Sequence, residues 1–149
     1  MTNDLAQAKQ IAWKLLSDRE YARHELCHKL IQRGFDRERV DVLLDELQAD
    51  GLQSDERFAE IYIRSYAHRG QGPLKIQQAL RDKGVSDTII EICFEAGNYD
   101  WFALARELRA RKFGETVPKD FAARAKQSRF LQYRGFSWEQ IKAAFSKVE

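Results

Sequence analysis

One pentapeptide has the residue types and the spacing of a metal site. His24, Glu25 and His28 match the H-E-x-x-H pattern, and on a helix two histidines four residues apart share a face. Such a pair binds Zn²⁺ in hydrolases, where the glutamate acts as general base. Asp45 or Glu46 would have to complete the site, because His68, the other histidine, stands alone.

The surrounding sequence indicates that this H-E-x-x-H match arises by chance. The equivalent stretches of two similar segments, residues 74–78 and 125–129, contain no histidine. Zinc proteases of this class place the motif helix beside a sheet, and no strand pattern is present here. A Gly-rich phosphate loop, a serine nucleophile elbow and a supported Cys–His pair are missing too. We therefore expect no catalytic residue, no metal and no cofactor, and keep a zinc hydrolase using His24, Glu25 and His28 as a remote alternative.

A second candidate chemistry is the binding of anions by basic side chains. Residues 100–149 carry 11 Lys and Arg against six Asp and Glu, a net +5, whereas residues 1–54 and 55–99 have net charges of −2 and −1. Cations with interleaved aromatic rings can follow a phosphate backbone and stack on bases; a solvated charged face is an equal alternative. The candidate phosphate-binding side chains are those of Arg106, Arg109, Arg111, Lys112, Arg124, Lys126, Arg129 and Arg134, with the aromatic rings of Phe130 and Tyr133 among them.

Sequence-specific reading of DNA is not expected, although helix–Gly turn–helix patterns occur. A recognition helix presents basic or amide groups to base edges near its N-terminus. The helices that follow the glycine turns begin with carboxylates, for example Asp36, Asp87 and Glu139. These would face the phosphate-lined groove, so any DNA contact is expected to be weak and independent of sequence.

Composition indicates a soluble protein with a highly charged surface. Of 149 residues, 44% are apolar and 32% are charged, which is the balance of a folded rather than a disordered chain. The apolar runs are far shorter than a bilayer requires, and residues 1–10 show no signal-peptide pattern. Cys27 and Cys93 fit buried thiols better than a disulfide framework. We expect a cytoplasmic monomer that is not bound to a membrane.

Helical periodicity runs through the chain, and no stretch alternates with period two. Residues 40, 43, 44 and 47 form one apolar stripe, and Trp101, Leu104, Ala105 and Leu108 form another, with Arg106, Arg109, Arg111 and Lys112 on the other faces. Pro73 suits a helix start, and a late helix should run from about Lys119 to Arg134. The predicted N-terminal caps are a capping box at Ser17–Glu20, Asp36, Ser54 or Asp55, Ser86, Asp100, and a second box at Ser137–Gln140.

Three glycine turns recur with a nearly fixed period. Gly34, Gly84 and Gly135 lie 50 and 51 residues apart, each with a cation before it, an apolar residue after it and a capping Asp or Ser next. This period indicates repeated supersecondary units. We predict an all-α chain of three tandem three-helix repeats, residues 1–53, 54–98 and 99–149. Three small bundles on short connectors predict an elongated, curved rod.

These features together bear a resemblance to a known family. Asp55–Ala59, the corner Arg69-Gly70-Gln71-Gly72-Pro73, Lys83-Gly84-Val85 and Arg129–Ser137 resemble the corresponding stretches of the RecX regulatory proteins. The match covers nearly the whole chain, and the central stretch is its most specific part. His24 replaces a polar or acidic residue of the family, which creates the H-E-x-x-H match.

The resemblance implies that the chain is a regulator and not an enzyme. It implies binding in the groove of the RecA filament and modulation, most often inhibition, of RecA ATPase, strand exchange and co-protease activities, in recombination, DNA repair and the SOS response. The alternative is sequence-independent DNA binding that competes for single-stranded DNA. The expected partner-binding residues are the cations Arg64, Arg69, Lys75, Arg81, Lys83, Arg124, Lys126, Arg129 and Arg134.

Overall fold

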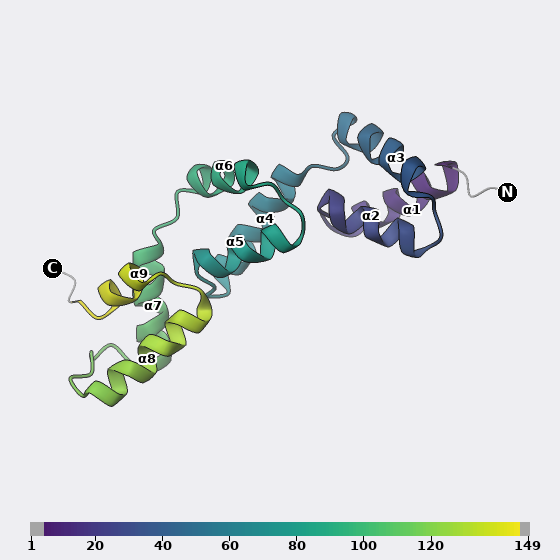
Figure 1. The fold of residues 1–149 in the computed structure, drawn as a ribbon. Helices are drawn as coiled ribbons and strands as arrows, with labels where there is room; N and C mark the ends of the chain where they lie inside the picture. Colours follow the sequence, from purple (N-terminus) through teal and green to yellow (C-terminus); the bar gives the residue numbers. More distant parts are fainter. Residues whose placement is uncertain (1–4, 147–149) are drawn as a thin grey trace. The chain divides into compact units, whose positions relative to one another are not determined.

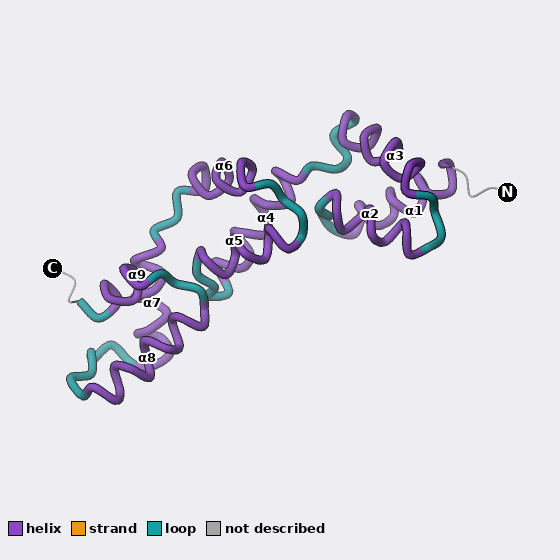
Figure 2. The backbone as a smooth tube through the Cα atoms, in the orientation of Figure 1, coloured by secondary structure: helices purple, strands orange, loops and turns teal. Residues whose placement is uncertain are grey.

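The computed structural model describes residues 5–146, and this part of the chain is all-helical, with no strand (Figures 1 and 2). The predicted fold class is confirmed. The nine helices described are α1 Leu5–Asp18, α2 Arg23–Gln32, α3 Arg37–Ala49, α4 Asp55–His68, α5 Pro73–Asp82, α6 Asp87–Gly97, α7 Trp101–Phe113, α8 Phe121–Arg134 and α9 Trp138–Ala144.

The chain forms two compact units. Unit 1 contains residues up to 61 and residues 80–93, and unit 2 contains residues 62–79 and those from 94 onward. Helices α4, α5 and α6 each contribute to both units. The predicted repeat boundaries after residues 53 and 98 and the predicted rod therefore stay predictions, and each unit is described by itself.

Most of the predicted N-terminal caps are confirmed. The hydroxyl of Ser54 accepts from the Arg57 N–H at 3.1 Å, and that of Ser86 accepts from the Ile89 N–H at 3.3 Å. Asp100 caps α7 through the Ala103 N–H at 3.0 Å. The Ser137 box is complete, since the Gln140 N–H donates to the Ser137 hydroxyl and the Ser137 N–H donates to the Gln140 side chain. These side chains satisfy N–H groups that have no partner within the helix.

The predicted capping box at Ser17–Glu20 is wrong. Helix α1 continues to Asp18, and the Ser17 hydroxyl donates back to the Lys14 carbonyl at 2.7 Å. The Glu20 carboxylate instead accepts from Arg57 Nε at 2.7 Å. Helix α2 begins later, where the Ala22 N–H donates to the Glu25 carboxylate at 3.1 Å.

Two smaller differences concern helix starts. Asp36 stands at the N-cap of α3, but its side chain makes no capping hydrogen bond. Helix α8 begins at Phe121 rather than near Lys119, and the Asp120 carboxylate caps it by accepting from the Ala123 N–H at 3.0 Å.

The core of unit 1 is built from the apolar stripes of its first helices. Leu26 and Leu30 of α2 are fully buried, as are Val40, Leu44 and Leu47 of α3. Leu43 completes the predicted stripe of α3 at the i, i+3, i+4, i+7 positions, which is confirmed.

Glu25 joins the start of α2 to the turn that follows α5. Its carboxylate accepts from the Ala22 N–H, from Arg19 at 3.3 Å and from Lys83 at 3.1 Å. Burial raises the pKa of Glu25, but the hydrogen bonds from Ala22, Arg19 and Lys83 outweigh it and hold the pKa below its ordinary value of 4.5. A carboxylate with a lowered folded-state pKa stabilises the fold above its unfolded-state pKa, and this stabilisation is lost as pH falls through the folded-state pKa.

Glu25→Gln should therefore destabilise the protein by about 1–2 kcal/mol at pH 7, because hydrogen bonds to a charged group are lost. The difference from the native chain should begin to shrink as pH falls below 4.5, where Glu25 of the unfolded chain takes up a proton, and should be smallest below the lowered pKa of native Glu25. Urea unfolding at several pH values measures this. Glu46→Gln, which breaks the exposed Lys9–Glu46 pair, is the matched control and should cost clearly less than Glu25→Gln, because exposed pairs contribute little stability. Equal losses at both sites would show that Glu25 has no special role.

The core of unit 2 lies between α7, α8 and α9. Ala105 and Leu131 are fully buried, and Phe136, Ile141 and Ala144 are nearly so. Trp101 and Leu104 pack against this cluster, as the predicted inner face of α7 requires.

In unit 2 the corner of residues 70–73 packs directly on the turn between α8 and α9. Gly70, in the left-handed conformation with φ +90°, follows the end of α4. The Gly72 N–H donates to the Arg134 carbonyl at 2.7 Å, and the Leu74 N–H donates to the Gly135 carbonyl at 2.9 Å. The two backbones are so close that a Cβ on Gly72 would lie 2.5 Å from the Gly135 carbonyl carbon. The corner therefore tolerates no side chain at residue 72.

Gly72→Ala should separate this contact and lower stability by about 2 kcal/mol or more, since two backbone hydrogen bonds and the close packing of the two turns are disturbed. The control is Gly34→Ala: Gly34 has φ +98° but nothing within 4 Å of an added Cβ, so this change costs only its backbone strain, about 1 kcal/mol. Chemical unfolding of both variants measures the comparison. A Gly72→Ala variant that is more stable than Gly34→Ala would contradict the close contact.

Candidate partner-binding surface

The structure divides the predicted partner-binding cations between the two units. Arg81 and Lys83 belong to unit 1. Unit 2 contains Arg64, Arg69, Lys75, Arg124, Lys126, Arg129 and Arg134.

The two predicted partner-binding cations of unit 1, Arg81 and Lys83, both form ion pairs. Arg81 Nε lies 2.9 Å from the Asp87 carboxylate in an exposed pair, and Lys83 Nζ lies 3.1 Å from the more buried Glu25 carboxylate. Exposed pairs contribute little stability, so Arg81 remains available to a partner. Lys83 has a structural role at the start of α2.

Two cation–aromatic pairs flank the corner of unit 2. The Arg69 guanidinium lies 4.8 Å from the centre of the Tyr66 ring, and Lys75 Nζ lies 4.6 Å from the centre of the Tyr133 ring. The Gly72–Gly135 contact positions the second pair, because it holds the first turn of α5 against the end of α8. Tyr133 is 77% exposed. We call Tyr66, Arg69, Lys75 and Tyr133 the corner cluster.

The predicted cations of α8 have different environments. Lys126 and Arg129 are exposed, and Arg134 is half-buried, with its guanidinium 5.4 Å from the centre of the Phe130 ring. Arg124 donates to the Pro118 carbonyl at 3.2 Å and lies 4.8 Å from the centre of the Phe145 ring. Arg124 is exposed as well, so both of these contacts lie at the surface of unit 2. On α4, Arg64 is exposed.

The prediction that Arg109 lies on an outer face of α7 is wrong. Arg109 is only 2% exposed. Its Nε donates to the Ala144 carbonyl at 3.1 Å, one terminal nitrogen donates to the Gln127 side chain at 3.1 Å, and the other to the Glu115 carbonyl at 3.2 Å. Five donors on one planar group can join three segments, which an outward-facing arginine would not do. Arg109 thus ties α7 to α8, α9 and the loop after α7.

Arg109→Leu should lower the stability of the protein by about 3 kcal/mol, because it leaves buried carbonyl groups without donors. Arg109→Lys should recover little of this, since one ammonium group cannot reach all three acceptors. Denaturant midpoints measure the effect, with Arg111→Leu on the exposed part of the same helix as control, expected within about 0.5 kcal/mol. If Arg109→Lys were as stable as the native chain, the positive charge at residue 109, and not the three hydrogen bonds, would account for its contribution to stability.

The H-E-x-x-H residues lie on α2 without a metal-site arrangement. His24 and His28 are exposed, and Glu25 is bound by Arg19 and Lys83. The proposed third ligands have other partners: Asp45 pairs with Arg23 at 2.8 Å, and Glu46 pairs with Lys9. Within residues 5–146, no three His, Cys, Asp or Glu side chains are grouped to hold a metal ion.

The two cysteines are free and buried. Burial, and then the charges of Glu60 and Glu56, raise the pKa of Cys93 to about 11. Its thiol lies 3.5 Å from the Glu56 carbonyl. A thiol with this pKa is protonated at neutral pH and is therefore a poor nucleophile.

Among the described helices, none is both long and apolar enough to cross a membrane.

The fold described above defines an all-helical protein whose helices alternate with glycine turns. Sequence profiles of the first, second and third three-helix domains of RecX match residues 8–47, 54–93 and 98–145. This chain belongs to the RecX family.

Relatives and solved structures agree with this assignment. The regulatory protein RecX of Halorhodospira halophila is 44% identical over 141 residues, which cover 95% of this chain and 88% of that protein. That of Chromohalobacter salexigens is 40% identical and covers 98% of this chain and 95% of its own length. The crystal structure of RecX from Lactobacillus salivarius, 22% identical, has the same fold, with a TM-score of 0.81 over 97% of this chain and 96% of that one.

Proposed function

We propose that this chain is a cytoplasmic, non-catalytic regulator that binds the RecA nucleoprotein filament. It inhibits RecA ATPase, strand exchange and co-protease activities, and so acts in recombination, DNA repair and the SOS response. The observation that carries this proposal is membership of the RecX family across all three domains.

The corner cluster is the part of the described surface that best suits a protein partner. Tyrosine and arginine dominate binding energy at protein interfaces, where they combine apolar contact with directed hydrogen bonds. Here Tyr133 and Lys75 are held by the Gly72–Gly135 contact, so little conformational freedom is lost on binding. In the same unit, Arg64, Lys126 and Arg129 are exposed and could extend the contact. In unit 1, Arg81 is exposed too.

Competition for single-stranded DNA is the second candidate function. It is favoured by one observation: the exposed ring of Tyr133 lies beside Lys75, on a unit that also exposes Lys126 and Arg129. An aromatic ring beside cations can stack on a base while the cations contact phosphates. Such binding would be steeply weakened by salt.

Recombinase ATPase on single-stranded DNA tests the proposal. The protein should inhibit at amounts well below one per RecA subunit, because one bound molecule can stop filament growth past it. The double variant Arg69→Glu, Lys75→Glu should inhibit at least about tenfold less well, with stability changed by no more than about 0.5 kcal/mol. The matched control reverses two exposed arginines of α3, Arg37→Glu and Arg39→Glu, and should inhibit like the native chain.

DNA competition predicts a different pattern. Inhibition would then appear only at amounts that saturate the DNA, and an unrelated ATPase that depends on single-stranded DNA would be inhibited equally. That pattern, with no binding of RecA to the protein when DNA is absent, would reject the filament-binding proposal.

A further inference from the structure

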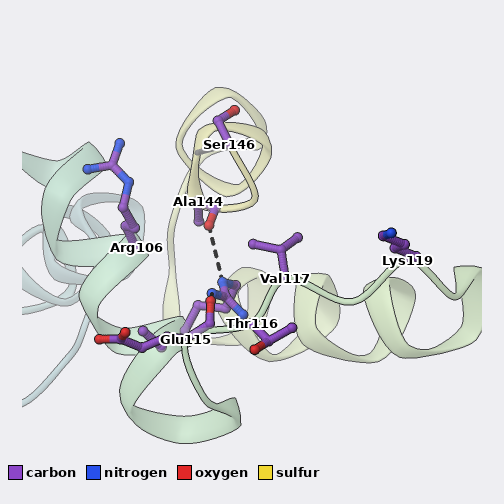
Figure 3. Close-up of a pocket in the computed structure, with 9 residues that line it drawn as sticks. Arg106, Glu115, Thr116, Val117, Lys119, Ala144 and Ser146 are labelled. Carbon is purple, nitrogen blue, oxygen red and sulfur yellow. Dashed lines mark hydrogen bonds between the residues drawn. The ribbon is translucent and has the colours of Figure 1, made fainter. Parts of the chain in front are cut away.

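A pocket of about 640 Å³ lies in unit 2, between α7, the segment 115–119 and the end of α9. Figure 3 shows Arg106 on one side of it and Lys119 on the other, with Ala144 and Ser146 from the C-terminal end of the unit between them. Ala110, Val117 and Ala144 give it apolar walls. No part of the corner cluster lines this pocket.

The charge of the pocket is positive and partly buried. Arg106, Arg109 and Lys119 line it, against a single acidic residue, the exposed Glu115. The Nε of Arg106 is buried and has no hydrogen-bond acceptor in the described part of the chain. Buried polar groups in folded proteins nearly always form a hydrogen bond. The Nε of Arg106 is an exception, which indicates that a ligand supplies its acceptor.

Arg109 adds a second source of uncompensated charge. All three of its hydrogen bonds go to neutral acceptors, the Ala144 and Glu115 carbonyls and the Gln127 amide oxygen. Within residues 5–146, these three bonds leave two of its five N–H donors without an acceptor. Burial alone lowers the pKa of Arg109, with no carboxylate opposing it. A buried guanidinium group is commonly paired with an anion, and among residues 5–146 neither Arg106 nor Arg109 forms an ion pair.

We propose that this pocket binds the carboxylate of an acidic side chain carried by a protein partner, with Arg106 as the main donor. A carboxylate on a flexible apolar stem fits this lining, because the stem can contact apolar walls while the carboxylate supplies the acceptor that the buried Nε of Arg106 lacks. A phosphodiester is flanked by a sugar on each side, so a DNA backbone cannot insert to the same depth. The proposal concerns the chemistry of the ligand and does not depend on which protein carries it.

The test uses the full chain and two blocked peptides, one alternating glutamate with leucine and the other glutamine with leucine. In NMR titrations at constant ionic strength, the glutamate peptide should shift the Arg106 Nε–Hε signal and the Val117 and Ala144 amide signals along one saturable curve. Arg106→Gln should weaken this binding about tenfold or more, as the loss of a charge-assisted hydrogen bond predicts. Arg111→Gln removes the same charge from an exposed position of α7 and should bind like the native chain.

Three results would overturn the proposal. The first is equal binding of the glutamine peptide, and the second is unchanged binding by Arg106→Gln with a native spectrum. The third is tighter binding of inorganic phosphate than of the glutamate peptide, which would make the pocket a phosphate site. None of these outcomes bears on RecA inhibition, which the ATPase assay measures separately.

Discussion

The backbone contact between Gly72 and Gly135 is the constraint on which unit 2 depends. Two helix-start N–H groups, which no helix can satisfy internally, are satisfied by the carbonyls of Arg134 and Gly135 on another turn. This requires a residue without Cβ at position 72. It explains in physical terms why the Gly-Gln-Gly-Pro corner is so distinctive: its glycines permit the contact, and Pro73 starts α5 without needing a donor.

The same kind of contact occurs inside unit 1, between different residues. A Cβ on Gly84 would lie 2.7 Å from the Cβ of His24, near the start of α2, and a Cβ on Gly135 would lie 2.7 Å from the backbone nitrogen of Lys75, near the start of α5. These two glycine turns therefore pack on the first turn of an earlier helix. Gly34 has no neighbour within 4 Å and serves only its own left-handed turn. The 50-residue period in the sequence thus marks a repeated packing arrangement as well as a repeated helix end.

Local patterns predicted most of the fold, and long-range contacts account for what was missed. Apolar stripes and caps such as Ser54 and Ser137 act over four residues, so the sequence reveals them. The Ser17 box failed because Glu20 is bound by Arg57, 37 residues away. Arg109 lacked any local signal, since its acceptors lie up to 35 residues distant. For the candidate surface, the sequence shows the cations and places Tyr133 near some of them, but the pairing of Lys75 with Tyr133 joins residues 58 positions apart and is visible only in the structure.

The proposed partner-binding surface depends on this packing, because the contact that closes the corner also holds Lys75 against Tyr133. Amide hydrogen exchange at Gly72 and Leu74 tests that contact most directly. N–H groups at a helix start ordinarily exchange rapidly, since they lack intrahelical acceptors. We expect strong protection of both amides in the native chain, and loss of this protection in Gly72→Ala while the core of unit 1 stays protected. Exchange of both amides at the rate of an unstructured chain would contradict it.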